Sequence, residues 1–193
     1  MRHIVRNAVF HERPVKLALL NRFPKSAQIA PVYAIIVLLI YGWTILGFFW
    51  KLPSWLNFMS IGEILVVMAY AAVVNFLESL CILLIPLLLC ALLPRKWFYD
   101  QFVARGTALV LLILGYAMFL TVQLETVVGY PKNLILLTIP VLGIILVAAY
   151  LAAKVELLRR LLESLSDRAI IFLYFSVPIS LISVCVVVIR NIF

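Results

Sequence analysis

Charged residues are scarce in this sequence. Only 12% of the 193 residues are Asp, Glu, Lys or Arg, whereas 66% are hydrophobic and the mean hydropathy is +1.19. Water-soluble domains carry about 25% charged and about 45–50% apolar residues, because they must cover their surface with polar groups. The composition therefore excludes an ordinary soluble domain and leaves no room for a second globular domain. It indicates a polytopic integral membrane protein.

Residue types that support catalysis or metal binding are also few. The two histidines, His3 and His11, precede the first apolar run, so no histidine is available within the membrane to bind haem iron. The three cysteines form no CxxC pair and lie within apolar runs, where a free Cys behaves as a small hydrophobe (Cys81, Cys90 and Cys185). The motifs GxxxxGK[ST], GxSxG and HExxH do not occur. We therefore expect a protein that is not an enzyme and binds no metal or cofactor.

Long hydrophobic runs are abundant. A transmembrane helix needs about 20 consecutive apolar residues, and five runs meet this requirement. They are continuously apolar, whereas the strands of a membrane barrel would alternate. We predict an all-α fold, in which residues 30–193 form a single transmembrane bundle of five helices. The predicted spans are Ala30–Trp50, Ile64–Leu93, Gly106–Val128, Leu134–Ala153 and Ala169–Ile189.

The positive charges predict how the chain is threaded. Lys and Arg concentrate in the cytoplasmic loops of membrane proteins. With five spans, all but Lys51, Lys132 and Arg190 fall on one side, so the N-terminus is predicted inside and the C-terminus outside. The charge excess is thus a topology signal, which argues against nucleic-acid binding. We expect the bacterial cytoplasmic membrane, with an organellar inner membrane as the alternative. The residues on the inner side are Arg2, Arg6, Arg13, Lys16, Arg22, Lys25, Arg95, Lys96, Arg105, Lys154, Arg159, Arg160 and Arg168.

Two segments are predicted to lie at the inner membrane surface. Residues 1–29 form a basic flank that we expect to contact anionic lipid headgroups, although a transit peptide is an alternative. Residues 154–168 are amphipathic, with leucines at helical spacing on one face. This segment either continues the fourth span as a helix at the inner interface or offers a docking surface for a partner helix. Its leucines are Leu157, Leu158, Leu161, Leu162 and Leu165.

Asn75 and Glu78 are polar residues in the middle of the second run. An ionised carboxylate at this depth costs about 2.5–3.5 kcal/mol, so it needs protonation, a partner or a water-filled cavity. Both residues fall on a stripe that we expect to face other helices. We interpret them as contacts between helices or subunits, with a proton or ion pathway or a lipid-headgroup site as alternatives. The predicted stripe is Ile64, Met68, Ala71, Asn75, Glu78, Ile82, Ile85 and Leu89.

Other polar residues offer partners for this pair. Ser176, Ser180 and Ser183 follow a 4,3 spacing that makes a small polar face suited to close helix packing. Glu63 and Glu125 fall near the outer membrane surface, where we expect solvated carboxylates. Further candidate partners within the spans are Thr44, Tyr116, Thr121 and Thr138.

These features favour a membrane-embedded structural or accessory subunit of a larger complex, which has no catalytic role and binds other membrane protein subunits. A small transporter or proton-conducting module that uses Glu78 is one alternative. The five spans of residues 30–193, with the chain leaving on the outer face, also resemble the membrane portion of sulfatase-fold lipid-headgroup transferases, such as lipoteichoic acid synthases and phosphoethanolamine transferases. That resemblance is one of topology and implies a membrane domain without its catalytic outer domain.

Overall fold

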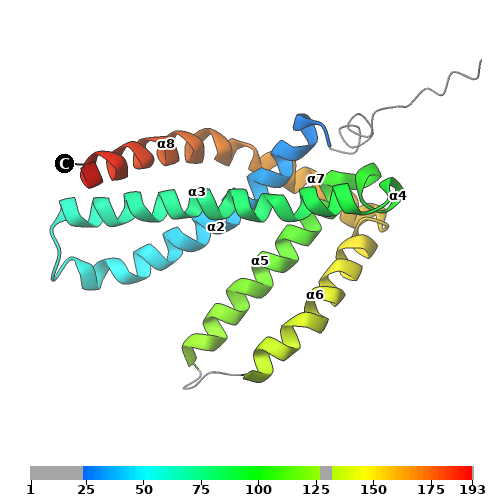
Figure 1. Cartoon of the computed structure of the whole chain (residues 1–193), viewed down its shortest axis with the longest axis horizontal. Coiled ribbons are helices and arrows are strands. Elements are labelled where there is room, and N and C mark those ends of the chain that lie inside the picture. Colours follow the sequence, from blue (N-terminus) through cyan, green and yellow to red (C-terminus); the bar gives the residue numbers. More distant parts are fainter. Residues whose placement is uncertain (1–23, 127–131, 193) are drawn as a thin grey trace, which may run out of the picture.

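The computed structural model describes residues 24–126 and 132–192, except for the side chains of residues 95–96, 124–126 and 132–137. The first 23 residues of the predicted basic flank lie outside this range. The described residues form helices and no strands (Figure 1). The elements are α2 (Ser26–Trp55), α3 (Ile61–Leu92), α4 (Arg95–Phe98), the 3₁₀ turn η1 (Tyr99–Gln101), α5 (Phe102–Thr126), α6 (Lys132–Ala152), α7 (Glu156–Ala169) and α8 (Ile171–Ile192).

The helices form two arms that meet at one end. In Figure 1, α3 and α8 run side by side with α2 packed across them, and α5 and α6 make a second arm that diverges from the first. The short elements α4 and α7 lie where the arms meet. There, α5 contacts α2 and α7, while α6 packs chiefly against α5. The bundle is therefore closed at one end and splayed at the other.

The all-α membrane fold predicted from the apolar runs is confirmed. Four helices are long and apolar enough to cross a membrane, namely α2, α3, α5 and α8. A fifth span arises if Thr138–Ala152 and α7, which are bent by 99° across a short break, count as one. The same bend makes α7 a separate helix rather than a straight continuation of the fourth span, which was one of the two alternatives for residues 154–168. The side of the membrane on which each terminus lies remains a prediction.

α7 lies across the end of α6 and packs against α2 and α5 (Figure 1). Its buried residues are Ser166 and Ala169, whereas most of its leucines are exposed. Two i,i+4 ion pairs lie along α7, since Glu156 accepts from Arg160 and Glu163 lies 3.9 Å from Arg159. A helix with leucines on one face and ion pairs on another can lie in the plane of the interface. The exposed leucines are Leu157, Leu158, Leu161 and Leu165, and Leu162 is half-buried.

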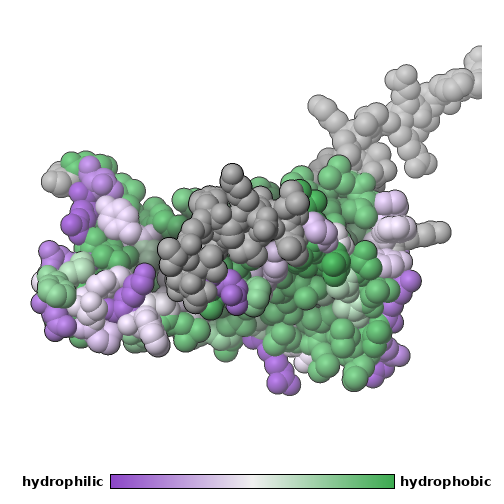
Figure 2. All heavy atoms as spheres, turned by 90° about the horizontal axis from the view of Figure 1, so that it is seen from below, coloured by the Kyte–Doolittle hydropathy of each residue, from purple (hydrophilic) through white to green (hydrophobic). Residues whose placement is uncertain are grey.

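The core gathers where α2 crosses α5. Val32, Ile35 and Ile36 of α2 pack against Phe102 and Leu109 of α5, and all five side chains are 1% exposed or less. Elsewhere the surface is largely apolar, and Figure 2 shows a broad hydrophobic area with polar side chains along its edges. Large side chains such as Trp50 and Phe58 are more than 80% exposed. An apolar exterior of this extent is expected of helices surrounded by lipid.

Gly106 sets the closest approach of this crossing. A Cβ atom at Gly106 would lie 3.2 and 3.3 Å from the two methyl carbons of Val32, which is fully buried. The β-branched Val32 side chain has little rotamer freedom in a helix and cannot move aside. Pro86 of α3 borders the same site, with its Cβ 3.9 Å from that position. Glycine therefore lets α2, α3 and α5 pack together.

Gly106→Ala is expected to destabilise the fold by about 1–3 kcal/mol, because an added methyl group overpacks the crossing. Gly115→Ala is the matched control, since Gly115 lies on the same helix and nothing stands within 4 Å of its position. The control should be neutral or slightly stabilising, because alanine favours the helix. Unfolding free energies from denaturing-detergent titrations would measure both. Equal effects of the two substitutions would contradict a tight crossing at Gly106.

Candidate functional site

Hydroxyl groups of α2 form hydrogen bonds to two polar side chains of α3. The Tyr33 hydroxyl lies 3.1 Å from the hydroxyl of Ser79, and the Thr44 hydroxyl donates to Oδ1 of Asn75 at 3.0 Å. Asn75 is 6% exposed and Ser79 is fully buried. Asn75 therefore joins two helices, and Thr44 is one of the partners considered from the sequence. Ser79 went unrecognised there, although it stands four residues after Asn75 on the same helix face.

Tyr41 joins three helices. Its hydroxyl lies 2.6 Å from that of Ser180 in α8 and donates to the carbonyl of Ala72 in α3 at 3.2 Å. Ser180 and Ser176 also donate to backbone carbonyls of their own helix. Ser176, Ser180 and Ser183 are all buried, so this face of α8 packs inside the bundle. Their small side chains allow α8 to lie close beside α3 (Figure 1).

Glu78 does not share the buried position of Asn75, and the predicted stripe is wrong here. The buried residues of α3 include Asn75, Ser79 and Pro86, while Glu78 is exposed. Met68 and Ile85, also on the predicted stripe, are 43% and 37% exposed. Successive residues of a helix differ in direction by about 100°. Because Ser79 points inward, the carboxyl of Glu78, one residue earlier, points away from the core formed by α2, α3 and α8.

The Glu78 side chain instead lines a small cavity between the two arms. The cavity has a volume of about 140 Å³ and is bounded by α2, α3 and α5. Thr44 and Thr121 add hydroxyl groups to a wall that is otherwise mainly apolar. No hydrogen-bond or ion-pair partner of the Glu78 carboxyl occurs among residues 24–126 and 132–192 whose side chains are described. We call this space the Glu78 cavity; its lining residues are Ile40, Trp43, Thr44, Glu78, Leu114, Ala117, Met118 and Thr121.

The depth of the Glu78 cavity makes its carboxyl unusual. Glu78 lies near the middle of α3, about 26 Å from Ile61 and about 21 Å from Leu92 at 1.5 Å per residue. No Lys or Arg lines the cavity. A carboxyl group can donate one hydrogen bond when protonated and accept several when ionised. The site can therefore bind a polar or cationic group that is brought to it.

The remaining predicted sites have simpler roles. Glu63 is exposed and caps α3, because its carboxylate accepts from the backbone N–H and the hydroxyl of Ser60. The backbone of Glu125 belongs to α5, but its side chain lies outside the described residues. Tyr116 and Thr138 approach each other at 3.4 Å and join α5 to α6. Within the described part of the chain, no three His, Cys, Asp or Glu residues gather where they could hold a metal ion.

Tyr41→Phe is expected to lower the free energy of unfolding by about 1–2 kcal/mol, because it removes the hydroxyl that bridges α3 and α8. Tyr174→Phe provides the control, since Tyr174 is 75% exposed on α8. Denaturing-detergent titration of both variants would measure the difference. A Tyr41→Phe protein as stable as the Tyr174→Phe protein would contradict a bridging role.

Comparison with known proteins adds nothing to these observations, since no protein-family model, no curated protein and no solved structure matches this chain. Any functional assignment therefore depends on its own side chains, and the Glu78 cavity is the strongest candidate among them.

Proposed function

We propose that this protein is a non-catalytic, membrane-embedded accessory subunit of a larger membrane complex. In this proposal a transmembrane helix of another subunit enters between the two arms and brings a polar side chain to Glu78. The observation that supports it most is the carboxyl of Glu78, which lies in mid-helix and has no partner among the described residues. A carboxyl in that position is costly in lipid and gains stability from any hydrogen-bond donor or cation.

The walls of the Glu78 cavity, which encloses about 140 Å³, suit a single side chain that projects from a partner helix packed across them. Leu114, Ala117, Met118 and Thr121 project at helical spacing from α5, opposite Trp43 and Glu78. Ala117 is small, so a helix can approach α5 closely, and Trp43 is 40% exposed and available for packing. Polar side chains that meet between transmembrane helices contribute about 0.6–2 kcal/mol each. Glu78 can thus fix the partner's register while apolar packing supplies most of the contact area.

The proposed membrane and orientation follow from the Lys and Arg distribution. We place the N-terminus, α4 and α7 on the cytoplasmic side of a bacterial inner membrane. The exposed leucines of α7 then enter the acyl region, and its Glu156–Arg160 pair, with both side chains more than 60% exposed, faces the headgroups and water. This arrangement puts the closed end of the bundle at the inner surface and opens the splayed arms toward the outer leaflet.

A proton-conducting module is the second candidate, and the polar lining of the Glu78 cavity favours it. Thr44 and Thr121 stand in the same cavity as Glu78 and could hold water beside the carboxyl. A pathway would further require polar groups that continue toward both membrane surfaces. The lining residues that surround these three are apolar, and for this reason we favour the accessory subunit.

Glu78→Leu is expected to reduce co-purification of the partner subunit about 3- to 30-fold in mild detergent, because it removes a polar contact worth about 0.6–2 kcal/mol. Glu78→Gln should retain most of the partner, since the amide still forms hydrogen bonds. Leu77→Ala, at an exposed neighbouring position, is the control for the loss of side-chain bulk. Mass spectrometry of the purified complexes would quantify the ratio of the two chains.

Failure of the proposal has a clear signature. If the unsubstituted protein carries no stoichiometric membrane partner, or if Glu78→Leu retains it as well as Leu77→Ala does, then Glu78 does not bind another subunit. Proton flux into vesicles containing the purified protein, lost in Glu78→Gln, would instead support the conducting module.

A further inference from the structure

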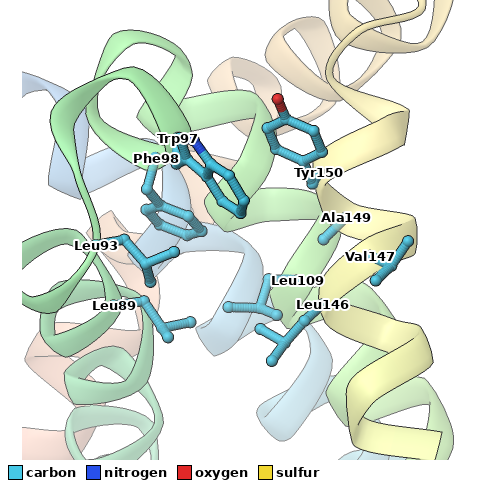
Figure 3. Close-up of a pocket in the computed structure, with 9 residues that line it drawn as sticks. All are labelled: Leu89, Leu93, Trp97, Phe98, Leu109, Leu146, Val147, Ala149 and Tyr150. Atoms are coloured by element: carbon cyan, nitrogen blue, oxygen red, sulfur yellow. The ribbon is translucent and has the colours of Figure 1, made fainter.

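A second cavity lies at the opposite side of α5, between the end of α3, the short helix α4 and the inner half of α6. Its volume is about 400 Å³ and its lining is almost entirely apolar. Leu89 and Phe98 form one wall, and Leu109 and Leu146 face them from α5 and α6 (Figure 3). Trp97 and Tyr150 stand together at one end of the space. We call it the α4 cavity.

The aromatic end of the α4 cavity carries positive charge. Trp97 stacks on Tyr150 with their ring centroids 5.6 Å apart. The guanidinium carbon of Arg105 lies 5.0 Å from the centroid of the Tyr150 ring, and Nζ of Lys154 lies 4.7 Å from it. Lys154 is exposed and makes no ion pair with an acid among the described side chains. One end of an apolar cavity is therefore marked by two aromatic rings and two cations.

We propose that the α4 cavity binds an anionic phospholipid, with one acyl chain inside the cavity and the phosphate beside the exposed Lys154. The arrangement matches the ligand, because a phospholipid is apolar along its chain and negative at one end. Basic pockets between transmembrane helices on the cytoplasmic side bind such headgroups, and Trp and Tyr concentrate at that depth. The site shares no residue with the Glu78 cavity and rests on the proposed function only in placing α4 at the cytoplasmic surface.

The size of the α4 cavity favours a lipid over a protein segment. A helix is about 10 Å across and rises 5.4 Å per turn, so one turn alone occupies roughly 400 Å³. A single turn of helix would therefore fill the cavity. A flexible acyl chain has no such requirement. The charge at one end also gives no advantage to an apolar helix, whereas it attracts a phosphate.

Fluorescence quenching of Trp97 provides the test. The full chain carries four Trp residues, so Trp43→Phe, Trp50→Phe and Trp55→Phe leave Trp97 as the single emitter. This protein would be placed in vesicles of phosphatidylcholine and phosphatidylglycerol at a fixed ratio, with bromine on the chains of either one lipid or the other. We expect brominated phosphatidylglycerol to quench Trp97 with an apparent affinity about fivefold or more above that of brominated phosphatidylcholine.

Two substitutions separate the headgroup from the chain. Lys154→Gln should remove most of the preference for phosphatidylglycerol, while Lys51→Gln, an exposed lysine on α2, should leave it unchanged. Leu146→Phe should lower quenching by both lipids because it fills the cavity, whereas Leu142→Phe, one turn away, should not. Equal quenching by the two lipids, or a preference that survives Lys154→Gln, would overturn the proposed phosphate position. Undiminished quenching in Leu146→Phe would overturn binding of the chain in the cavity.

Discussion

The hydroxyl groups of α2 are the interactions on which the assembly of this bundle depends. In a bilayer, apolar side chains gain little by leaving lipid for one another, so helices associate through close packing and hydrogen bonds. Tyr33, Tyr41 and Thr44 reach both α3 and α8 from a single helix. The polar groups that would be expensive in lipid are thereby turned inward, and they determine which helices are neighbours.

The second arm is attached in a different way. α5 meets α2 through tightly packed apolar side chains and the glycine contact at Gly106, and this contact is confined to one end of the helix. Beyond Leu114 the arms separate, and the Glu78 cavity lies at that separation. Because the two arms are joined only at the closed end of the bundle, the space between them at the splayed end is open to a partner. The α4 cavity, at the closed end, belongs instead to the membrane surface.

Much of the architecture could be predicted from the sequence, because continuous apolar runs and helical periodicity are local properties. The positions of α2, α3, α5 and α8, and the polar face of Ser176, Ser180 and Ser183, follow from them. The bend before α7 was missed, since neither glycine nor proline marks residues 153–155. The direction of Glu78 was also missed. Asn75 fits one helical stripe with Glu78 and another with Ser79, and only packing against Tyr33 selects the second.

The two cavities could not be predicted from the sequence at all. Their walls combine residues from α2, α3 and α5 in one case and from α3, α4, α5 and α6 in the other. These combinations depend on the angle between the arms, which no local pattern encodes. The sequence did identify Thr44 and Ser180 as candidate polar partners. It could not pair Thr44 with Asn75 or Ser180 with Tyr41, because the two members of these pairs lie 31 and 139 residues apart in the chain.

A partner helix can reach Glu78 only if the two arms diverge in the isolated protein. Pulsed electron paramagnetic resonance on a cysteine-free background tests this directly, with spin labels at Met68 of α3 and Val122 of α5, two exposed positions. The reference is a second pair of labels, at Met68 of α3 and Val186 of α8. Both residues line one hollow between these two helices, so their distance represents neighbouring helices. We predict that the Met68–Val122 distance is clearly longer than the Met68–Val186 distance in bilayers. Two similar distances would mean that the arms are closed around Glu78, which would contradict a partner site between them.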